Sequence, residues 1–136
     1  MHIDENLKIL LNAEHLSVSL RWLNLMSVEE KWGLAHEEKL RLLGNISDLE
    51  FDSLRNLDER NSLTELAISV LERLVLLILI AKNLAAMVGA EQSLKAFNAD
   101  NSNRIFNYQS LKSYLLDSES VEQFYMVLRY LENNTH

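Results

Sequence analysis

The sequence predicts an all-α fold. Its 136 residues contain no proline and only three glycines, which leaves little of the turn chemistry that a β-rich fold requires. No stretch alternates apolar and polar residues over six positions, as a half-buried strand would. Hydrophobic residues make up 48% of the chain and charged residues 24%, a balance typical of globular proteins. This length allows one compact domain, or two small subdomains that share a core.

The first half of the chain is expected to form four helices. Residues 6–14 and 17–32 make the first two, and Gly33 ends the second because glycine accepts the left-handed conformation common at helix C-termini. The second helix is expected to direct four residues inward, namely Leu20, Leu23, Leu25 and Met26. The third helix, 37–43, ends before Gly44. Ser47 and Glu50 have the spacing of a capping box, which predicts a fourth helix over 48–57.

A long central helix should follow. A second box, Ser62 to Glu65, predicts its start, and Gly89 predicts its end. Residues 74–81 are eight consecutive apolar residues, whereas a membrane span needs about 20. A helix that is apolar all round is usually buried. We therefore interpret this run as a core helix with a contact in a homodimer, the commonest closed oligomer, and not as a membrane segment.

Three short helices are expected at the C-terminal end, over 90–97, 108–116 and 121–132. A polar loop, 98–103, and a buried Phe106 separate the first two, and Ser120 with Gln123 gives a third box-like start. The chain then divides into a helical part with a helix-turn-helix (1–60), the long central hydrophobic helix (61–89), and a small three-helix subdomain with its tail (90–136).

Helices 37–43 and 48–57 have the dimensions of a helix-turn-helix. The expected inward residues are Leu40, Leu43, Ile46, Phe51 and Leu54, and the candidate DNA contacts are Lys39, Arg41, Ser53, Arg55 and Arg60. The second helix and its flank also carry five acids, Asp48, Glu50, Asp52, Asp58 and Glu59. Acids in this position repel phosphate, and the net charge of the chain is −7. We therefore interpret the pair as scaffold and expect weak DNA binding by the free protein.

No catalytic, metal or cofactor site is expected. The four histidines, His2, His15, His36 and His136, include no pair at the i, i+4 spacing of a helical metal site. Cysteine is absent, and no nucleophile motif or phosphate-binding glycine loop is present. The N-terminal residues do not resemble a secretion signal. The sequence thus predicts a cytoplasmic protein that is not an enzyme.

The last helix is the expected binding element. Val121, Phe124, Leu128 and Leu131 form one stripe that should face the core. Met126, Arg129 and Tyr130 form a second face of residue types favoured at interfaces. The alternative is that Tyr130 lies on the subdomain surface while Arg129 pairs with an acid. The full set of candidate partner-binding residues is Tyr125, Met126, Arg129, Tyr130, Asn133, Asn134 and His136.

Two segments resemble one family. Phe106 with Ser110-Leu111, Leu115-Leu116 and the run Val127 to Leu131 resemble the C-terminal toxin-binding domain of the MbcA/ParS/Xre family of bacterial antitoxins. Residues 31–47, with W-G-L, E-E and L-L-G-x-I in order, resemble the Xre-like N-terminal domain of the same family. Asn107-Tyr108 stands where such proteins usually have Gly-Gly.

The resemblance implies an antitoxin of a type II toxin–antitoxin pair. Its partner would be a RES-type toxin that uses NAD, which the antitoxin would inhibit by covering the active site with its C-terminal segment. Such proteins often repress their own operon as well. Two other functions remain open: a helix-turn-helix transcription regulator without a toxin, and a non-enzymatic interaction adaptor.

Overall fold

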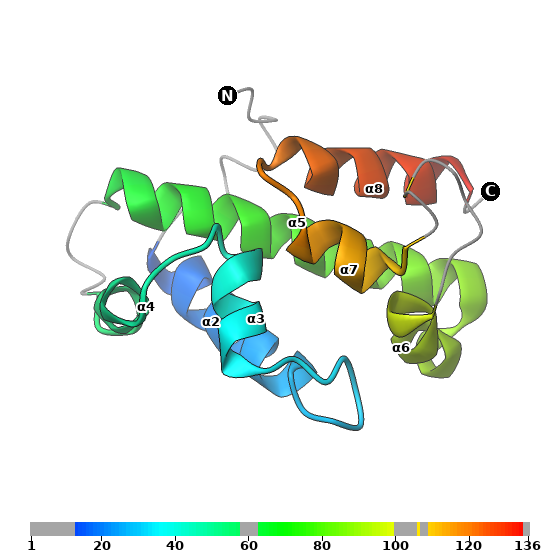
Figure 1. Cartoon of the computed structure of the whole chain (residues 1–136), viewed down its shortest axis with the longest axis horizontal. Coiled ribbons are helices and arrows are strands. Elements are labelled where there is room, and N and C mark those ends of the chain that lie inside the picture. The colour runs from blue at the N-terminus through cyan, green and yellow to red at the C-terminus, as the bar shows by residue number, and fades with distance from the viewer. Residues whose placement is uncertain (1–12, 58–62, 100–105, 107–108, 135–136) are drawn as a thin grey trace.

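The computed structural model describes residues 13–57, 63–99, 106 and 109–134, and within these ranges helices joined by turns and loops are its regular secondary structure. Figure 1 shows the helices in chain order. They are α2 (Ala13–Met26), α3 (His36–Leu42), α4 (Asp48–Arg55), α5 (Glu65–Val88), α6 (Ala90–Asn98), α7 (Leu111–Leu116) and α8 (Glu122–Asn133). The all-α prediction is therefore confirmed. Most of the expected helix 6–14 lies outside the described residues, as do Asn107 and Tyr108.

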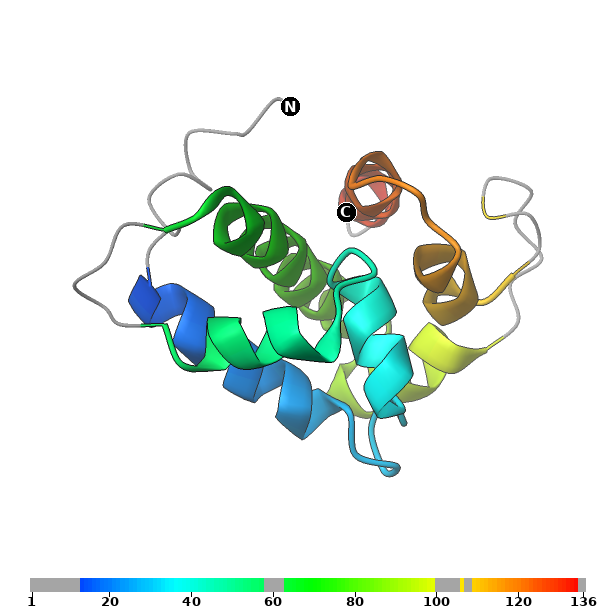
Figure 2. The ribbon, with the colours of Figure 1, turned by 60° about the vertical axis from the view of Figure 1, so that its left-hand side comes forward.

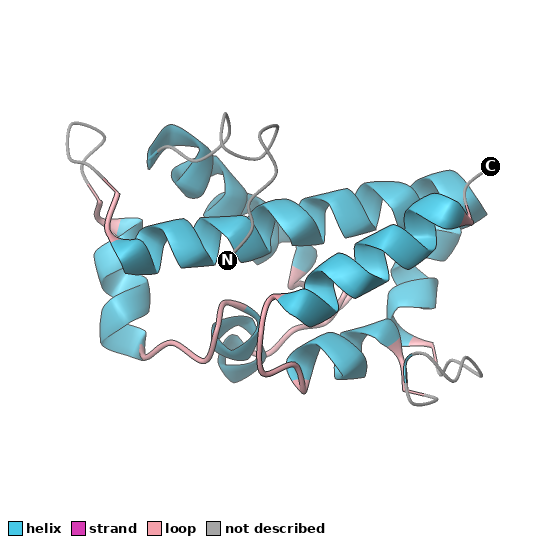
Figure 3. Ribbon diagram, turned by 90° about the horizontal axis from the view of Figure 1, so that it is seen from above, coloured by secondary structure: helices cyan, strands magenta, loops and turns pink. Residues whose placement is uncertain are grey.

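Helix α5 is the centre of the molecule. It packs against α2, α6 and α8, and Figure 3 shows α8 alongside it. Leu74, Leu76, Leu77 and Ile80 are fully buried, because α5 is apolar on every side and other helices of the same chain surround it. The expected burial is confirmed for residues 74–77 and for Ile80, whereas Ile78, Leu79 and Ala81 are half-buried. The half-buried positions do not identify a partner, so the homodimer stays a prediction.

The remaining helices form two groups around α5. Figure 2 shows α2 with α4 on one side and α7 with α8 on another, and α3 packs on α7. One continuous core cluster joins buried side chains from all three expected segments. Among the described residues no single helix is long and apolar enough to cross a membrane; α5 and α6 meet those criteria only as a pair bent by 116°.

The two helices expected to form the helix-turn-helix are separate, with residues 43–47 between them. The expected inward residues are confirmed: Leu43, Ile46, Phe51 and Leu54 are buried and Leu40 is half-buried. Helix α3 packs mainly against α7, whereas α4 packs mainly against α2. A DNA-binding role for the pair stays a prediction.

Helix α2 ends at Met26, six residues before the expected end at residue 32. The Trp32 N–H donates to the Met26 carbonyl at 2.9 Å, which turns the chain back. The indole then stacks on Phe97 of α6 with ring centroids 3.9 Å apart. The expected inward position of Leu25 is wrong, since its side chain is 63% exposed. A helix continued to residue 32 would carry Trp32 away from Phe97.

The helix starts follow local hydrogen bonds. The Ser47 box is confirmed: the Glu50 N–H donates to Ser47 Oγ at 3.1 Å, and Glu50 Oε1 accepts from the Ser47 N–H at 2.9 Å. Helix α5 begins at Glu65 under Thr64, whose hydroxyl accepts from the Ala67 N–H. The prediction of Ser62 as the opening residue is therefore wrong. The Ser120 hydroxyl donates to the Gln123 side chain, and it accepts from the Glu122 N–H.

Candidate functional site on helix α8

The inner side of α8 is part of the core. Phe124, Leu128 and Leu131 are buried and Val121 is half-buried, as the apolar stripe predicted. Val127 is fully buried as well, which the sequence did not indicate. These positions lie within a third of the helix circumference, so they fix which residues of α8 face outward.

The outer side of α8 carries what we call the α8 face: Met126, Arg129 and Tyr130. Met126 is 42% exposed. Arg129 is exposed and has no hydrogen bond or ion pair with any residue in the described part of the chain. Tyr130 is half-buried and meets the buried ring of Phe106 edge to face, with centroids 5.0 Å apart. The alternative for Arg129, pairing with an acid, is not observed within those residues, whereas Tyr130 does rest on the subdomain.

Tyr114 of α7 extends the α8 face, and the sequence did not single it out. Its hydroxyl donates to Met126 Sδ at 3.2 Å, and its ring contacts Phe106 with centroids 5.3 Å apart. Phe106 therefore supports two tyrosines from different helices. A tyrosine among the leucines of α7 could have indicated an exposed or partner-binding position. Its contact with Met126 could not be predicted, because it depends on how α7 and α8 pack.

The other candidate partner-binding residues lie at the edges of this face. Tyr125 is half-buried, and its hydroxyl donates inward to Glu72 Oε2 at 3.0 Å. Asn133 is exposed. The Asn134 side chain donates to the Tyr130 carbonyl at 2.7 Å, where α8 ends. His136 lies outside the described residues.

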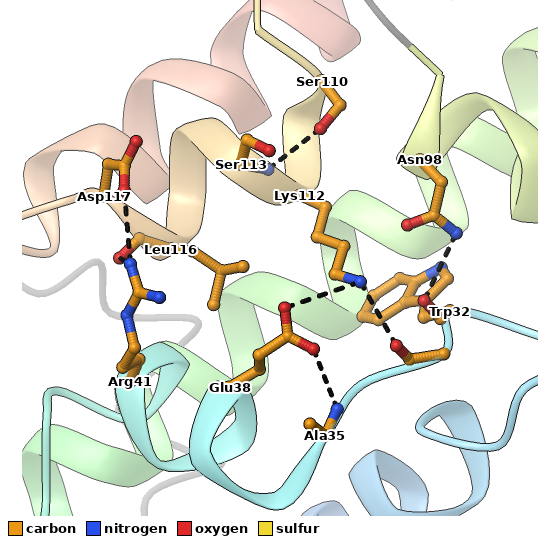
Figure 4. Close-up of polar contacts among 11 residues, drawn as sticks. Trp32, Ala35, Glu38, Arg41, Asn98, Ser110, Lys112, Ser113, Leu116 and Asp117 are labelled. Carbon is orange, nitrogen blue, oxygen red and sulfur yellow. Dashed lines mark hydrogen bonds and ion pairs between the residues drawn. The ribbon is translucent and has the colours of Figure 1, made fainter.

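The candidate DNA contacts do not form one basic surface. Lys39 Nζ donates to Asn24 Oδ1 at 3.0 Å. Arg41 donates to the Leu116 carbonyl and to Asp117 at 3.1 and 3.2 Å (Figure 4). Both α3 cations thus take part in contacts within the fold. On α4, Ser53 is exposed, and Arg55 lies 3.5 Å from Asp52. Arg60 lies outside the described residues.

Polar contacts join α3 and its preceding loop to α7 (Figure 4). Lys112 of α7 donates to the Gly33 carbonyl at 3.2 Å and lies 3.7 Å from Glu38. Glu38 in turn accepts from the Ala35 N–H at 2.9 Å. Together with the Arg41 contacts, these bonds fix the first helices against the C-terminal subdomain.

A buried charged pair on α5 is the second feature that the sequence did not identify as a site. Glu72 is 1% exposed and Arg73 is 8% exposed. Burial raises the pKa of Glu72, against the lowering effects of the Tyr125 hydroxyl and of Arg73. Burial likewise lowers the pKa of Arg73, against the effect of Glu72. The position of these two charged residues directly before the apolar run 74–81 could have indicated that they are buried.

The described residues contain no group of three or more histidines or carboxylates placed to hold a metal ion. Comparison of the chain with protein-family models, with curated proteins and with solved structures finds no match. The geometry of α8 and the charges of α3 and α4 are therefore the observations on which a function can be proposed.

Proposed function

We propose that this protein is the antitoxin of a type II toxin–antitoxin pair. It binds a RES-type toxin that uses NAD and covers the toxin's active site, without chemistry of its own. The resemblance of residues 31–47 and 106–131 to the MbcA/ParS/Xre family suggests the partner. The observation that supports this contact is the α8 face on the outside of the last helix. There a methionine and a tyrosine held by Phe106 lie beside Arg129, which has no partner among the described residues.

The three side chains of the α8 face suit protein binding for different physical reasons. Arg129 offers five N–H donors with no described residue as acceptor. Met126 is flexible and polarisable, so it adapts to the shape of a partner. Tyr130 is held by Phe106, so little side-chain entropy is lost when a partner covers it. Arginine and tyrosine are also the residue types enriched among the dominant contacts of interfaces.

The observations on α3 and α4 favour this function over transcriptional regulation. Lys39 and Arg41 form contacts inside the molecule, and these contacts compete with any phosphate. The exposed surface of α4 carries Asp48, Glu50 and Asp52, which repel a polyanion. Repression of its own operon would then need a surface that the toxin supplies.

The test is co-expression with a RES-domain protein encoded by the adjacent gene. Arg129→Ala and Tyr130→Ala should each weaken binding by about 1–3 kcal/mol, as truncation of a dominant contact does, and should reduce the protection of cell growth. Arg21→Ala is the matched control, because Arg21 is an exposed arginine on α2 without a hydrogen bond or ion pair to the described residues.

Thermal melting of each variant separates binding from folding. Arg129→Ala and Tyr130→Ala should melt close to the wild-type protein or slightly below it, since Tyr130 also packs on Phe106. Phe124→Ala should lose about 3–5 kcal/mol of stability, because it removes a fully buried ring. If both α8 variants protect cells as well as Arg21→Ala does, the toxin is bound elsewhere. If the adjacent gene product is not bound at all, the antitoxin assignment fails.

A further inference from the structure

A polar cavity of about 430 Å³ opens between two turns that are distant in sequence. One wall is the α3–α4 turn with Gly44 and Asn45, and the other is the α7–α8 turn from Leu116 to Glu119. Arg73, from the middle of α5, lines the cavity between them. The cavity is separate from the α8 face and plays no part in the proposed function.

Arg73 is the unusual residue of this cavity. It is 92% buried, given its 8% exposure, and its Nε and Nη1 atoms have no hydrogen-bond partner among the described residues. Its Cζ atom lies 5.2 Å from the centroid of the Phe124 ring. This cation–π contact supplies attraction to the guanidinium, but it supplies no acceptor for the N–H groups. A buried cation with unsatisfied donors is costly. Nε and Nη1 are covered from solvent, so Nη2 is the guanidinium nitrogen that an acceptor in the cavity would contact.

The surroundings of Arg73 define the charge of that acceptor. Arg41 and Asp117 hold each other at 3.2 Å, and the other Asp117 oxygen accepts from Gln109 at 3.0 Å. Their charges therefore cancel within the fold. Glu119 is an exposed carboxylate at the rim. Two carboxyl groups therefore act on the charge of Arg73, namely Glu119 in the cavity and Glu72 beside it on α5. A doubly charged anion would be repelled by them more strongly than a singly charged one.

The backbone near Arg73 is shaped for close approach. Gly44 has φ +108°, and a Cβ there would lie 3.2 Å from Arg73 Nε. The following residue, Asn45, also has a positive φ of 64°, which asparagine tolerates better than most residues. Two consecutive left-handed residues bring the turn against the guanidinium and form one wall of the cavity.

We infer that this cavity binds a small organic carboxylate, whose oxygens accept from the Arg73 guanidinium between the α3–α4 and α7–α8 turns. A carboxylate suits this site because its charge strengthens the hydrogen bond that it accepts from the guanidinium. Leu116, Asn45 and Ser118 line the remaining space. Bound there, the ligand would contact both the first half of the chain and the C-terminal subdomain.

The experiment titrates the full chain with sodium acetate and follows thermal melting, with sodium chloride at the same ionic strength as reference. A ligand that binds the folded state raises the melting temperature in a saturable way. Arg73→Met is the principal variant, because methionine fills a similar volume without N–H groups. It should bind acetate at least about tenfold more weakly, which corresponds to about 1.4 kcal/mol. Arg55→Ala, on the exposed surface of α4, should respond as the wild-type protein does.

Three results would overturn the inference. The first is an acetate response no larger than the chloride response. The second is an equal response in Arg73→Met, which would identify a general salt effect. The third is a stronger response to inorganic phosphate than to acetate, which would contradict the carboxylate assignment. If Arg73→Met does not fold, the NMR signal of the Arg73 Nε–H group gives the same answer. This signal is identified by its absence from the spectrum of Arg73→Lys. The Arg73 signal must shift on addition of acetate.

Discussion

At the scale of single residues, the buried charges of α5 distinguish this core from a purely apolar one. Glu72 accepts from Tyr125 of α8, and Arg73 lies over the ring of Phe124 on the same helix. Each charge therefore joins α5 to α8 through a contact with an aromatic residue. Charged groups in a core cost desolvation free energy. We therefore expect the free energy of unfolding to depend on pH through these residues.

Glu72→Gln tests this dependence. Burial raises the pKa of Glu72 above its ordinary value of 4.5, so the folded state holds this proton to a higher pH than the unfolded chain does. The stability from protonated Glu72 is complete below pH 4.5 and is lost as the pH rises through the raised pKa. The described groups that act on its carboxyl are the Tyr125 hydroxyl, which donates to it, and the charges of Arg73 and Glu122.

Denaturant unfolding of both proteins between pH 4 and pH 7 gives the measurement. The wild-type protein should lose stability relative to Glu72→Gln as the pH rises, by about 1.4 kcal/mol for each unit by which the pKa is raised. Glutamine keeps an oxygen that accepts from the Tyr125 hydroxyl, so the variant should fold. If the wild-type protein keeps or gains stability relative to Glu72→Gln as the pH rises, the folded-state pKa of Glu72 is not raised.

Gly44→Ala and Gly89→Ala separate backbone strain from contact with Arg73. Both glycines have positive φ, +108° and +91°, so alanine is strained at either position by about 1–2 kcal/mol. A Cβ at Gly89 meets nothing within 4 Å, whereas one at Gly44 lies 3.2 Å from Arg73 Nε. Gly44→Ala should therefore cost more stability than Gly89→Ala in chemical denaturation. An equal loss would mean that the Arg73 side chain moves aside freely.

At the scale of helices, what the sequence predicted depended on how local the cause was. The Ser47 box was predictable because both of its hydrogen bonds join residues three positions apart. The end of α2 at Met26 was not, because it depends on the stacking of Trp32 on Phe97, which is 65 positions away. The start of α5 was misplaced because Ser62 and Thr64 are both suitable caps.

The α4 cap gives a prediction at this scale. Ser47→Ala removes the acceptor for the Glu50 N–H and should cost about 1 kcal/mol of stability. Ser53→Ala is the control, because Ser53 is exposed on the same helix and alanine is the better helix former there. The expected order of melting temperatures is Ser47→Ala below wild type, with Ser53→Ala at or above it. The reverse order would show that the cap does not stabilise α4.

At the scale of the whole molecule, α5 is the central helix against which α2, α6 and α8 pack. The sequence indicated this position through one long apolar run. The α8 face was predictable in part, because the apolar stripe of α8 fixes which of its residues face the core and leaves the others outside. Tyr114 and the Arg73 cavity were not predictable. The cavity combines Arg41, Gly44, Asn45 and Arg73 with residues 116–119, and only the packing of the helices brings these together.

The distribution of charge over the molecule leads to the last prediction, that the free protein binds DNA weakly. Its net charge is −7, the α3 cations Lys39 and Arg41 bind within the fold, and α4 exposes three acids. Counterion release from phosphates is the main source of affinity for DNA, and little of it is available here. Fluorescence anisotropy with its own promoter DNA, at roughly 150 mM salt, should give a dissociation constant of about 1 µM or weaker.

Charge-neutral variants of α4 show whether this helix is responsible. Glu50→Gln keeps the side-chain acceptor of the capping box, and Asp52→Asn is a second neutral substitution on the exposed side. If α4 approaches DNA at all, the double variant should bind more tightly than the wild-type protein and with a steeper dependence on salt. Glu91→Gln with Glu132→Gln changes the net charge equally on other helices and should have a smaller effect. Nanomolar binding by the unmodified free protein would contradict the prediction and make α4 a DNA-reading helix.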